Sequence, residues 1–165
     1  METIKIKYFS DDVPSIEKIE NGDWIDLYAA EDVAIEQFHH CYIPLGIGMA
    51  LPEGYEAYIL PRSSLIKRGI ICANSMGMID NSYCGNDDQW HFSAVCITEP
   101  KDGWDGLTAD GDGVHKYVYI KKGERICQFR IMKNQPEVKF EIVDNLSDIS
   151  RGGLGSTGGY KNGKD

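Results

Sequence analysis

The sequence QWHFSAVCI, residues 89–97, alternates polar and apolar side chains. A period of two places successive side chains on opposite faces of a β-strand, so this stretch predicts a strand with one buried face. The same pattern indicates further strands over residues 4–9, 55–60, 114–120, 126–132 and 138–143. Most of the chain is therefore expected to be β-sheet.

Short turns separate the predicted strands. Residues 121–124 (KKGE) form a turn that could pair the strands on either side as a hairpin. Residues 63–68 are the one short helix expected, with hydroxyl side chains available as N-cap and Gly69 just past its end. The predicted fold is an all-β, jelly-roll-like barrel or sandwich of short strands with one short helix.

The chain length of 165 residues suits a single hydrophobic core. We expect one β domain over residues 1–143, with an acidic, glycine-rich surface insert at about residues 99–113 (EPKDGWDGLTADGDG). Residues 144–165 are rich in glycine and cannot fold alone, which predicts a flexible C-terminal arm that could order on a ligand.

Composition limits the classes of function. The net charge of −9 disfavours a nucleic-acid groove, and a triphosphate ligand would need a few local cations and a divalent metal. No apolar run is long enough for a membrane span, and residues 1–10 lack an export signal. The five cysteines are odd in number and scattered, as in buried thiols of a cytoplasmic protein.

The strongest single motif is NSMGMIDNSYCG, residues 74–85. It resembles the uracil-binding hairpin of the homotrimeric dUTP pyrophosphatase family. The resemblance implies that the main chain around Gly77, Met78 and Ile79 pairs with the base, and that Asn74 adds a side-chain contact. It also implies that Asp80 activates the attacking water, while Tyr83 packs on the deoxyribose and excludes a ribose hydroxyl.

Other segments match the family in the same order along the chain. In PRSSL, residues 61–65, the Arg62 guanidinium, the Ser63 and Ser64 hydroxyls and the start of a helical turn make a sound phosphate cradle. The resemblance implies that Asp26 lies near a triphosphate-bound metal, through water. It implies that Gln128 helps hold the α-phosphate and the water, whereas Glu124 and Arg125 are interpreted as structural.

The segment RGGLGSTG, residues 151–158, resembles the family's arm that closes over bound nucleotide. Backbone amides and hydroxyls in such a glycine-rich stretch can wrap a triphosphate. The binding residues implied here are Arg151, Gly153, Leu154, Gly155, Ser156 and Thr157. Leu154 stands where the family usually has an aromatic residue that stacks on uracil.

The resemblance implies a homotrimeric enzyme whose sites draw residues from all three subunits. Water would attack the α-phosphorus of dUTP with Mg²⁺ assistance, giving dUMP and pyrophosphate, limiting uracil incorporation into DNA and supplying dUMP. One alternative is a dCTP deaminase of the same fold, which relies on a catalytic glutamate instead of the Asp80 and Tyr83 pairing. Another is a phage-type enzyme that also binds a regulatory protein, for which the insert around Trp104 is a candidate surface.

Overall fold

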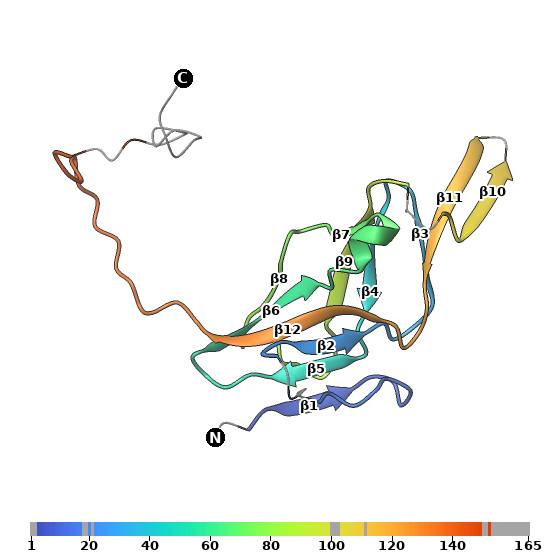
Figure 1. The fold of residues 1–165 in the computed structure, drawn as a ribbon. Coiled ribbons are helices and arrows are strands. Elements are labelled where there is room, and N and C mark those ends of the chain that lie inside the picture. Colours follow the sequence, from blue (N-terminus) through green and yellow to red (C-terminus); the bar gives the residue numbers. More distant parts are fainter. Residues whose placement is uncertain are drawn as a thin grey trace. The chain divides into compact units, whose positions relative to one another are not determined.

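Figure 1 shows the computed structural model of the chain, which describes residues 3–17, 20, 22–99, 103–110, 112–149 and 152. The chain divides into two units, Met1–Gln135 and Pro136–Asp165. Every strand lies in the first unit: β1 Lys5–Tyr8, β2 Ile25–Tyr28, β3 Val33–Glu36, β4 His40–Pro44, β5 Ile47–Ala50, β6 Tyr55–Pro61, β7 Ile70–Cys72, β8 Gly77–Ile79, β9 His91–Cys96, β10 Gly106–Asp110, β11 Gly113–Ile120 and β12 Arg125–Lys133. The described residues contain no α-helix, which confirms the all-β prediction.

The strands form antiparallel sheets. The largest has the order β2-β12-β6-β8, so the long strand β12 lies between β2 and β6 (Figure 1). Two further sheets have the orders β4-β9-β7 and β10-β11-β3, and β1 pairs with β5. Strands distant in sequence are thus neighbours, and residues 26, 61 and 128 come together around β12.

The hydrophobic core is built from the inward faces of these strands. Trp90, Phe92 and Phe129 are among the largest fully buried side chains. The rings of Trp90 and Phe129 pack edge to face at 5.5 Å and 83°, a favoured geometry for aromatic pairs. Since Phe129 is on β12 and Phe92 on β9, the two predicted strands supply the core as their alternation indicates.

The hairpin predicted around residues 121–124 is wrong. The turn itself is present, with Glu124 N–H donating to Lys121 C=O at 3.0 Å. However, β11 pairs with β10 and β3, whereas β12 pairs with β2 and β6. Hydrogen bonds from Gly123 N–H to Ala29 C=O and from Ala29 N–H to Glu124 C=O hold the turn against the segment after β2, where the chain crosses between sheets.

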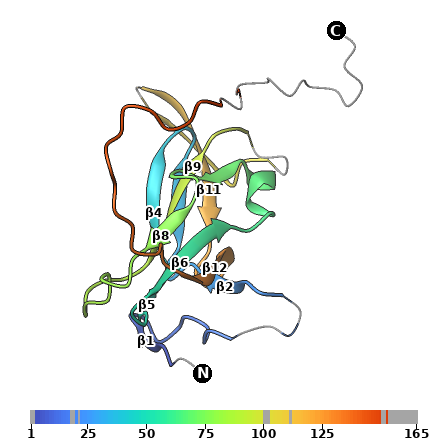
Figure 2. The same ribbon diagram turned by 90° about the vertical axis from the view of Figure 1, so that its left-hand side faces the viewer.

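Part of the predicted irregular insert is a strand. Residues Gly106–Asp110 form β10, which pairs with the first half of β11. Strand β3 pairs only with the second half of β11, from Tyr117 to Ile120. The β10–β11 hairpin therefore extends beyond the neighbouring strand, as Figures 1 and 2 show.

The predicted short helix is a 3₁₀ turn, η1, over Leu65–Arg68. Ser64 has helical dihedral angles and its side chain makes no capping hydrogen bond. Gly69 ends the turn in the left-handed region at φ +70°, where a Cβ would lie 2.4 Å from Thr98 O. Only glycine fits this position without strain, because other residues pay both a conformational and a steric cost.

The strand predicted over residues 138–143 is wrong, since residues 136–149 contain neither helix nor strand. Phe140 is 88% exposed and Ile142 is 100% exposed. The segment alternates polar and apolar residues as a strand does, but no described strand pairs with it. Among the described residues, no helix has the length and apolar character to cross a membrane.

Candidate active site

The residues of the 74–85 motif converge on one cavity of about 470 Å³. Its walls are Tyr42, Asn74, Gly77, Met78, Ile79, Asp80, Tyr83, Gln89, His91 and Ser93. Strand β8 supplies Gly77, Met78 and Ile79, the turn before it supplies Asn74, and the turn after it supplies Asp80 and Tyr83. Every residue of this motif that the sequence predicted as a ligand thus lines the cavity.

The approach to β8 is shaped by a tight turn. Ser75 has φ +65°, and Met76 N–H donates to Asn74 C=O at 2.7 Å. The Cys72 thiol donates to Asn74 Oδ1 at 3.0 Å, which fixes the amide group. No described residue accepts a hydrogen bond from Asn74 Nδ2, so its N–H groups can serve a ligand with carbonyl acceptors.

Beyond β8, a second turn places Asp80 and Tyr83. Tyr83 N–H donates to Asp80 C=O at 3.1 Å, and the Tyr83 hydroxyl donates to Gln89 C=O at 3.1 Å. Strand β8 pairs with β6 and not with the chain that follows it. The expected hairpin therefore takes the form of one strand between two turns, and both turns face the cavity.

Sequence reasoning missed part of this wall. Gln89, His91 and Ser93 are alternate residues of the predicted strand 89–97, so the same period of two that identified the strand also placed them on one face. His91 has no ligand spacing with the other histidines or with the cysteines, so the sequence did not single it out. Tyr42 carried no usable signal, because β4 was not predicted.

A second cavity of about 400 Å³ contains the predicted phosphate residues. It is lined by Trp24, Asp26, Pro61, Arg62, Ser63, Arg125 and Gln128. Asp26 and Gln128 are register partners on β2 and β12, and Gln128 also faces Leu60 on β6. The central position of β12 therefore joins three predicted segments at one place, whereas Ser64 begins η1 and does not line the cavity.

Two guanidinium groups share the carboxylate of this second cavity. Asp26 Oδ2 accepts hydrogen bonds from Arg62 Nη1 at 2.9 Å and from Arg125 Nη1 at 3.2 Å. The interpretation of Arg125 as purely structural is incomplete, because its side chain lies in the cavity beside Asp26. Two arginines around one carboxylate leave a net positive charge, which suits a phosphate.

The two cavities share no lining residue within one chain. Asp80 and Tyr83 belong to the first cavity, whereas Arg62, Ser63 and Gln128 belong to the second. Within one chain the predicted residues thus fall into two separate groups. Arg151, Gly153, Leu154, Gly155, Ser156 and Thr157 lie outside the described residues.

A resident metal centre has no basis in the described part of the chain, where no group of three or more His, Cys, Asp or Glu side chains could hold an ion. Asp26 is the only carboxylate of the second cavity. Mg²⁺ commonly binds through one or two carboxylates, several waters and the phosphates of a substrate. The residues thus fit a metal that arrives with a polyphosphate.

Known proteins resemble the chain along nearly its whole length. It is 50% identical over 156 residues to the SPbeta prophage-derived deoxyuridine 5'-triphosphate nucleotidohydrolase YosS of Bacillus subtilis, covering 94% of this chain and 97% of that protein. It is 34% identical to the deoxyuridine 5'-triphosphate nucleotidohydrolase of Thermobifida fusca, covering 98% of this chain and 82% of that protein.

Solved structures share the fold. A mutant dUTPase of Staphylococcus bacteriophage 80alpha, solved with dUpNHpp, has a TM-score of 0.73 at 23% identity and covers 96% of this chain and 99% of that chain. The dUTPase of Streptococcus mutans has a TM-score of 0.60 at 21% identity, covering 85% of this chain and 98% of that chain. The dUTPase family model matches residues 21–92. The chain belongs to the dUTPase family.

Proposed function

We propose that the chain hydrolyses dUTP to dUMP and pyrophosphate. The observation that carries the proposal is the cavity around β8, in which Asn74, Asp80 and Tyr83 all lie with the backbone of Gly77, Met78 and Ile79. A narrow site with backbone donors and acceptors, one carboxylate and one phenol ring suits a uracil deoxynucleotide. Identity of 50% to a deoxyuridine 5'-triphosphate nucleotidohydrolase supports the same reaction.

The active unit is a homotrimer in this proposal. We call the cavity around β8 the base-side cavity and the cavity around Asp26 and Arg62 the phosphate-side cavity. A single nucleotide needs both cavities, and in one chain they share no lining residue. A second copy can bring its Arg62, Ser63, Arg125 and Gln128 to the Asp80 of the first. A closed ring of three copies satisfies all such contacts at once, because each subunit gives one half to one neighbour.

Each residue has a distinct role in the reaction. Asp80 accepts a proton from water, and the water oxygen attacks the α-phosphorus while the bond to the β-phosphate oxygen breaks. Arg62, Ser63 and Gln128 hold phosphate oxygens, and Ser64 presents a hydroxyl at the start of η1. Tyr83, oriented by the Gln89 carbonyl, covers C2′ and excludes a ribose hydroxyl.

Mg²⁺ is the proposed metal, bound by the phosphate oxygens and linked to Asp26 through water. It would neutralise charge on the phosphates when bound. The glycine-rich arm completes the site in this proposal: Arg151 pairs with phosphate, the backbone of Gly153 and Gly155 with Ser156 and Thr157 wraps the chain of phosphates, and Leu154 covers the base.

The test is a substrate panel. Purified protein with Mg²⁺ is incubated with dUTP, dCTP, UTP and dTTP, and pyrophosphate and ammonia are followed together. The proposal expects pyrophosphate from dUTP only. Release of ammonia from dCTP would instead identify a deaminase, and no product from any nucleotide would identify a non-catalytic binder.

The proposed cellular role is to limit uracil incorporation into DNA and to supply dUMP, in the cytoplasm. Free cysteines support this compartment, since Cys72, Cys96 and Cys127 are buried thiols without disulfide partners. Burial raises the pKa of the Cys127 thiol well above its usual range, so this thiol stays protonated and unreactive.

A protein-binding role for the insert at residues 99–113 is a second proposal. The β10–β11 hairpin extends past β3 and exposes Leu107 and Val114, which are 62% and 67% accessible. A Leu107→Ser, Val114→Ser variant should keep dUTP turnover and lose any protein partner identified for the parent chain. Retained partner binding in that variant would remove the hairpin from consideration.

A further inference from the structure

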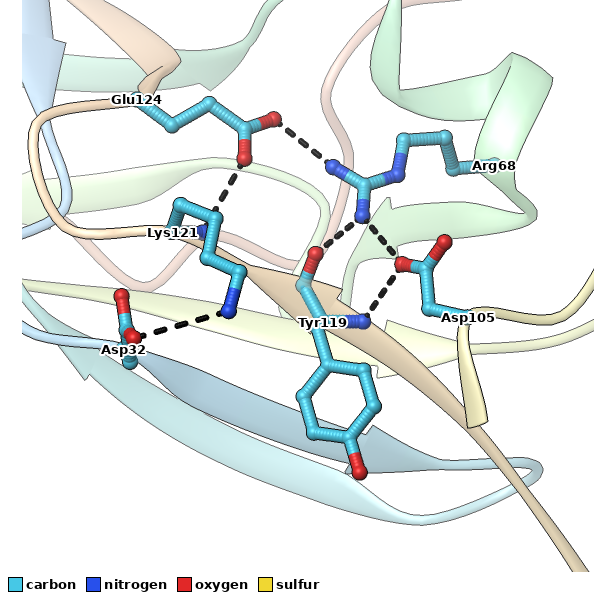
Figure 3. Close-up of polar contacts among 6 residues, drawn as sticks. All are labelled: Asp32, Arg68, Asp105, Tyr119, Lys121 and Glu124. Atoms are coloured by element: carbon cyan, nitrogen blue, oxygen red, sulfur yellow. Dashed lines mark hydrogen bonds and ion pairs between the residues drawn. The ribbon is translucent and has the colours of Figure 1, made fainter. Parts of the chain in front are cut away.

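Arg68, at the end of η1, forms the junction of three segments that are far apart in sequence (Figure 3). Its Nη1 donates to Glu124 Oε1 at 2.7 Å, and its Nη2 donates to Asp105 Oδ2 at 2.7 Å and to the carbonyl oxygen of Tyr119. The side chain is 24% exposed. Partial burial makes these charge-assisted bonds stronger than those of a freely exposed pair.

The acceptors are themselves fixed by the backbone. Glu124 Oε2 accepts from Lys121 N–H at 3.1 Å, and Asp105 Oδ2 accepts from Tyr119 N–H at 2.8 Å. Burial raises the pKa of Asp105, but the Tyr119 N–H and the Arg68 guanidinium outweigh it and lower the pKa overall. Asp105 therefore keeps its charge, the side chains of Asp105 and Glu124 are both held in direction by backbone N–H groups, and Arg68 binds η1 to this frame (Figure 3).

The residues of this frame are close in sequence to residues that line the phosphate-side cavity. Arg62 and Ser63 precede η1, and Arg125 follows Glu124 without an intervening residue. The same two segments are also tied by Arg62 N–H to Ile126 C=O at 3.0 Å. The Arg68–Glu124 bond is thus a further brace between the two walls that carry the phosphate ligands, in addition to the pairing of β6 with β12.

We propose that Arg68 is a positioning residue, which sets the spacing between the Arg62–Ser63 wall and the Arg125–Gln128 wall through its bond to Glu124. It lines neither cavity, so it acts through the residues that do. The effect on catalysis rests on the proposed function. The effect of Arg68 on the phosphate-side cavity can be tested by binding alone, without dUTP hydrolysis.

Lysine should not replace Arg68 fully. The planar guanidinium serves Glu124 from one nitrogen and Asp105 with the Tyr119 carbonyl from the other. An ammonium group is a point charge on a flexible stem and cannot hold these directions together. The tripolyphosphate affinity of Arg68→Lys is therefore expected to lie between that of the parent chain and that of Arg68→Gln.

The experiment measures Arg68→Gln, Arg68→Lys, Glu124→Gln and the double variant Arg68→Gln, Glu124→Gln. Lys67→Gln is the control. Lys67 lies in the same turn, is exposed, and makes no side-chain hydrogen bond or ion pair with the other described residues, so its substitution removes the same charge without the brace. The assembled full-length proteins are titrated with inorganic tripolyphosphate in a calorimeter, which measures the affinity of each variant directly. Deoxyuridine affinity, unfolding midpoint and dUTP kinetics are measured in parallel.

Arg68→Gln should weaken tripolyphosphate binding and lower kcat/KM for dUTP by on the order of 10- to 100-fold, because small misplacements of binding groups cost this much. Deoxyuridine affinity should stay unchanged, and Lys67→Gln should match the parent chain. The effects of Arg68→Gln and Glu124→Gln should not add, since both remove the same bond.

Tripolyphosphate affinity in Arg68→Gln equal to that of Lys67→Gln would overturn the inference. Equal losses for tripolyphosphate and deoxyuridine would also overturn it, because they would indicate a general loss of structure. If the parent chain binds tripolyphosphate but does not hydrolyse dUTP, the proposed function fails, and the tripolyphosphate comparison still decides the role of Arg68.

Discussion

At the scale of single residues, the account depends on side chains brought to the cavity by the turns around β8. Asp80 and Tyr83 share a turn closed by the bond from Tyr83 N–H to Asp80 C=O. Because they are three residues apart in this turn, both side chains can face one ligand. Such a pair can divide the work between chemistry and selectivity.

Asp80→Asn keeps the shape of the side chain and removes its basicity. We expect kcat for dUTP to fall by roughly 10²- to 10⁴-fold, the usual contribution of a positioned general base. Affinity for dUMP should stay within a factor of about two, since binding by the β8 backbone is unchanged. Stopped-flow detection of pyrophosphate measures the first quantity and calorimetry the second, and near-parental turnover would remove Asp80 as the base.

Tyr83→Ala removes the ring that covers the sugar. The preference for dUTP over UTP, measured as the ratio of kcat/KM values, should fall by about 10- to 200-fold, the range for one steric contact. Tyr83→Phe is the control, because it keeps the ring and loses only the hydroxyl bond to Gln89. An unchanged preference in the alanine variant would show that another residue excludes the ribose hydroxyl.

At the scale of elements, strands were predictable where one face is buried. Residues 89–97 and 126–132 alternate because Phe92 and Phe129 must point into the core. Strand β10 escaped prediction because its residues are mostly exposed and its pairing depends on β11. Residues 138–143 were predicted as a strand but do not form one, since a period of two is not sufficient without a partner strand.

The site was predictable to a similar degree. Asn74, residues 77–80 and Tyr83 belong to one contiguous motif, and the structure brings these residues to one cavity. Arg125 was missed because its role depends on the pairing of β12 with β2, which brings it to Asp26. His91 was missed because periodicity fixes the face of a strand but not what lies opposite that face.

His115, in the middle of the β10–β11 hairpin, makes a pH-dependent contact. His115 Nδ1 faces Glu36 Oε1, and its Nε2 faces Asp110 Oδ1 at 3.1 Å, so only the imidazolium form donates to both. Hydrogen bonds to Glu36 and then Asp110 raise the pKa of His115 above its ordinary 6.5. Hydrogen bonds from the Asp112 backbone and then from His115 lower the pKa of Asp110, so this acceptor stays charged in mild acid.

A raised native pKa means that the folded state binds the proton more tightly than the unfolded state. The contribution of His115 is therefore full below pH 6.5 and is lost as pH rises through the native pKa. His115→Gln should lower the free energy of unfolding more at about pH 5.5 than at about pH 9. Urea unfolding at both values tests this, with His91→Gln as control, because the His91 ring faces the Gln89 carbonyl and no carboxylate. A difference independent of pH would contradict the prediction.

At the scale of the whole molecule, the fold distributes the proposed nucleotide ligands over two cavities. Strand β8 is at one edge of the largest sheet and β2 is at the other (Figure 1). The base-side cavity is lined by residues of β8, whereas the phosphate-side cavity is lined by residues of β2 and β12. A net charge of −9 is compatible with an anionic substrate because Arg62 and Arg125 concentrate positive charge in one cavity. Activity should therefore depend on assembly.

Subunit mixing tests this claim most directly. Asp80→Asn damages only the base-side half and Arg62→Gln only the phosphate-side half, so each homotrimer should be nearly inactive. When the two variants are co-refolded in equal amounts, about a quarter of the sites should combine two intact halves from different subunits. Recovery of about a quarter of parental dUTP turnover is the predicted result, and mixed trimers with no more activity than the separate variants would contradict the account.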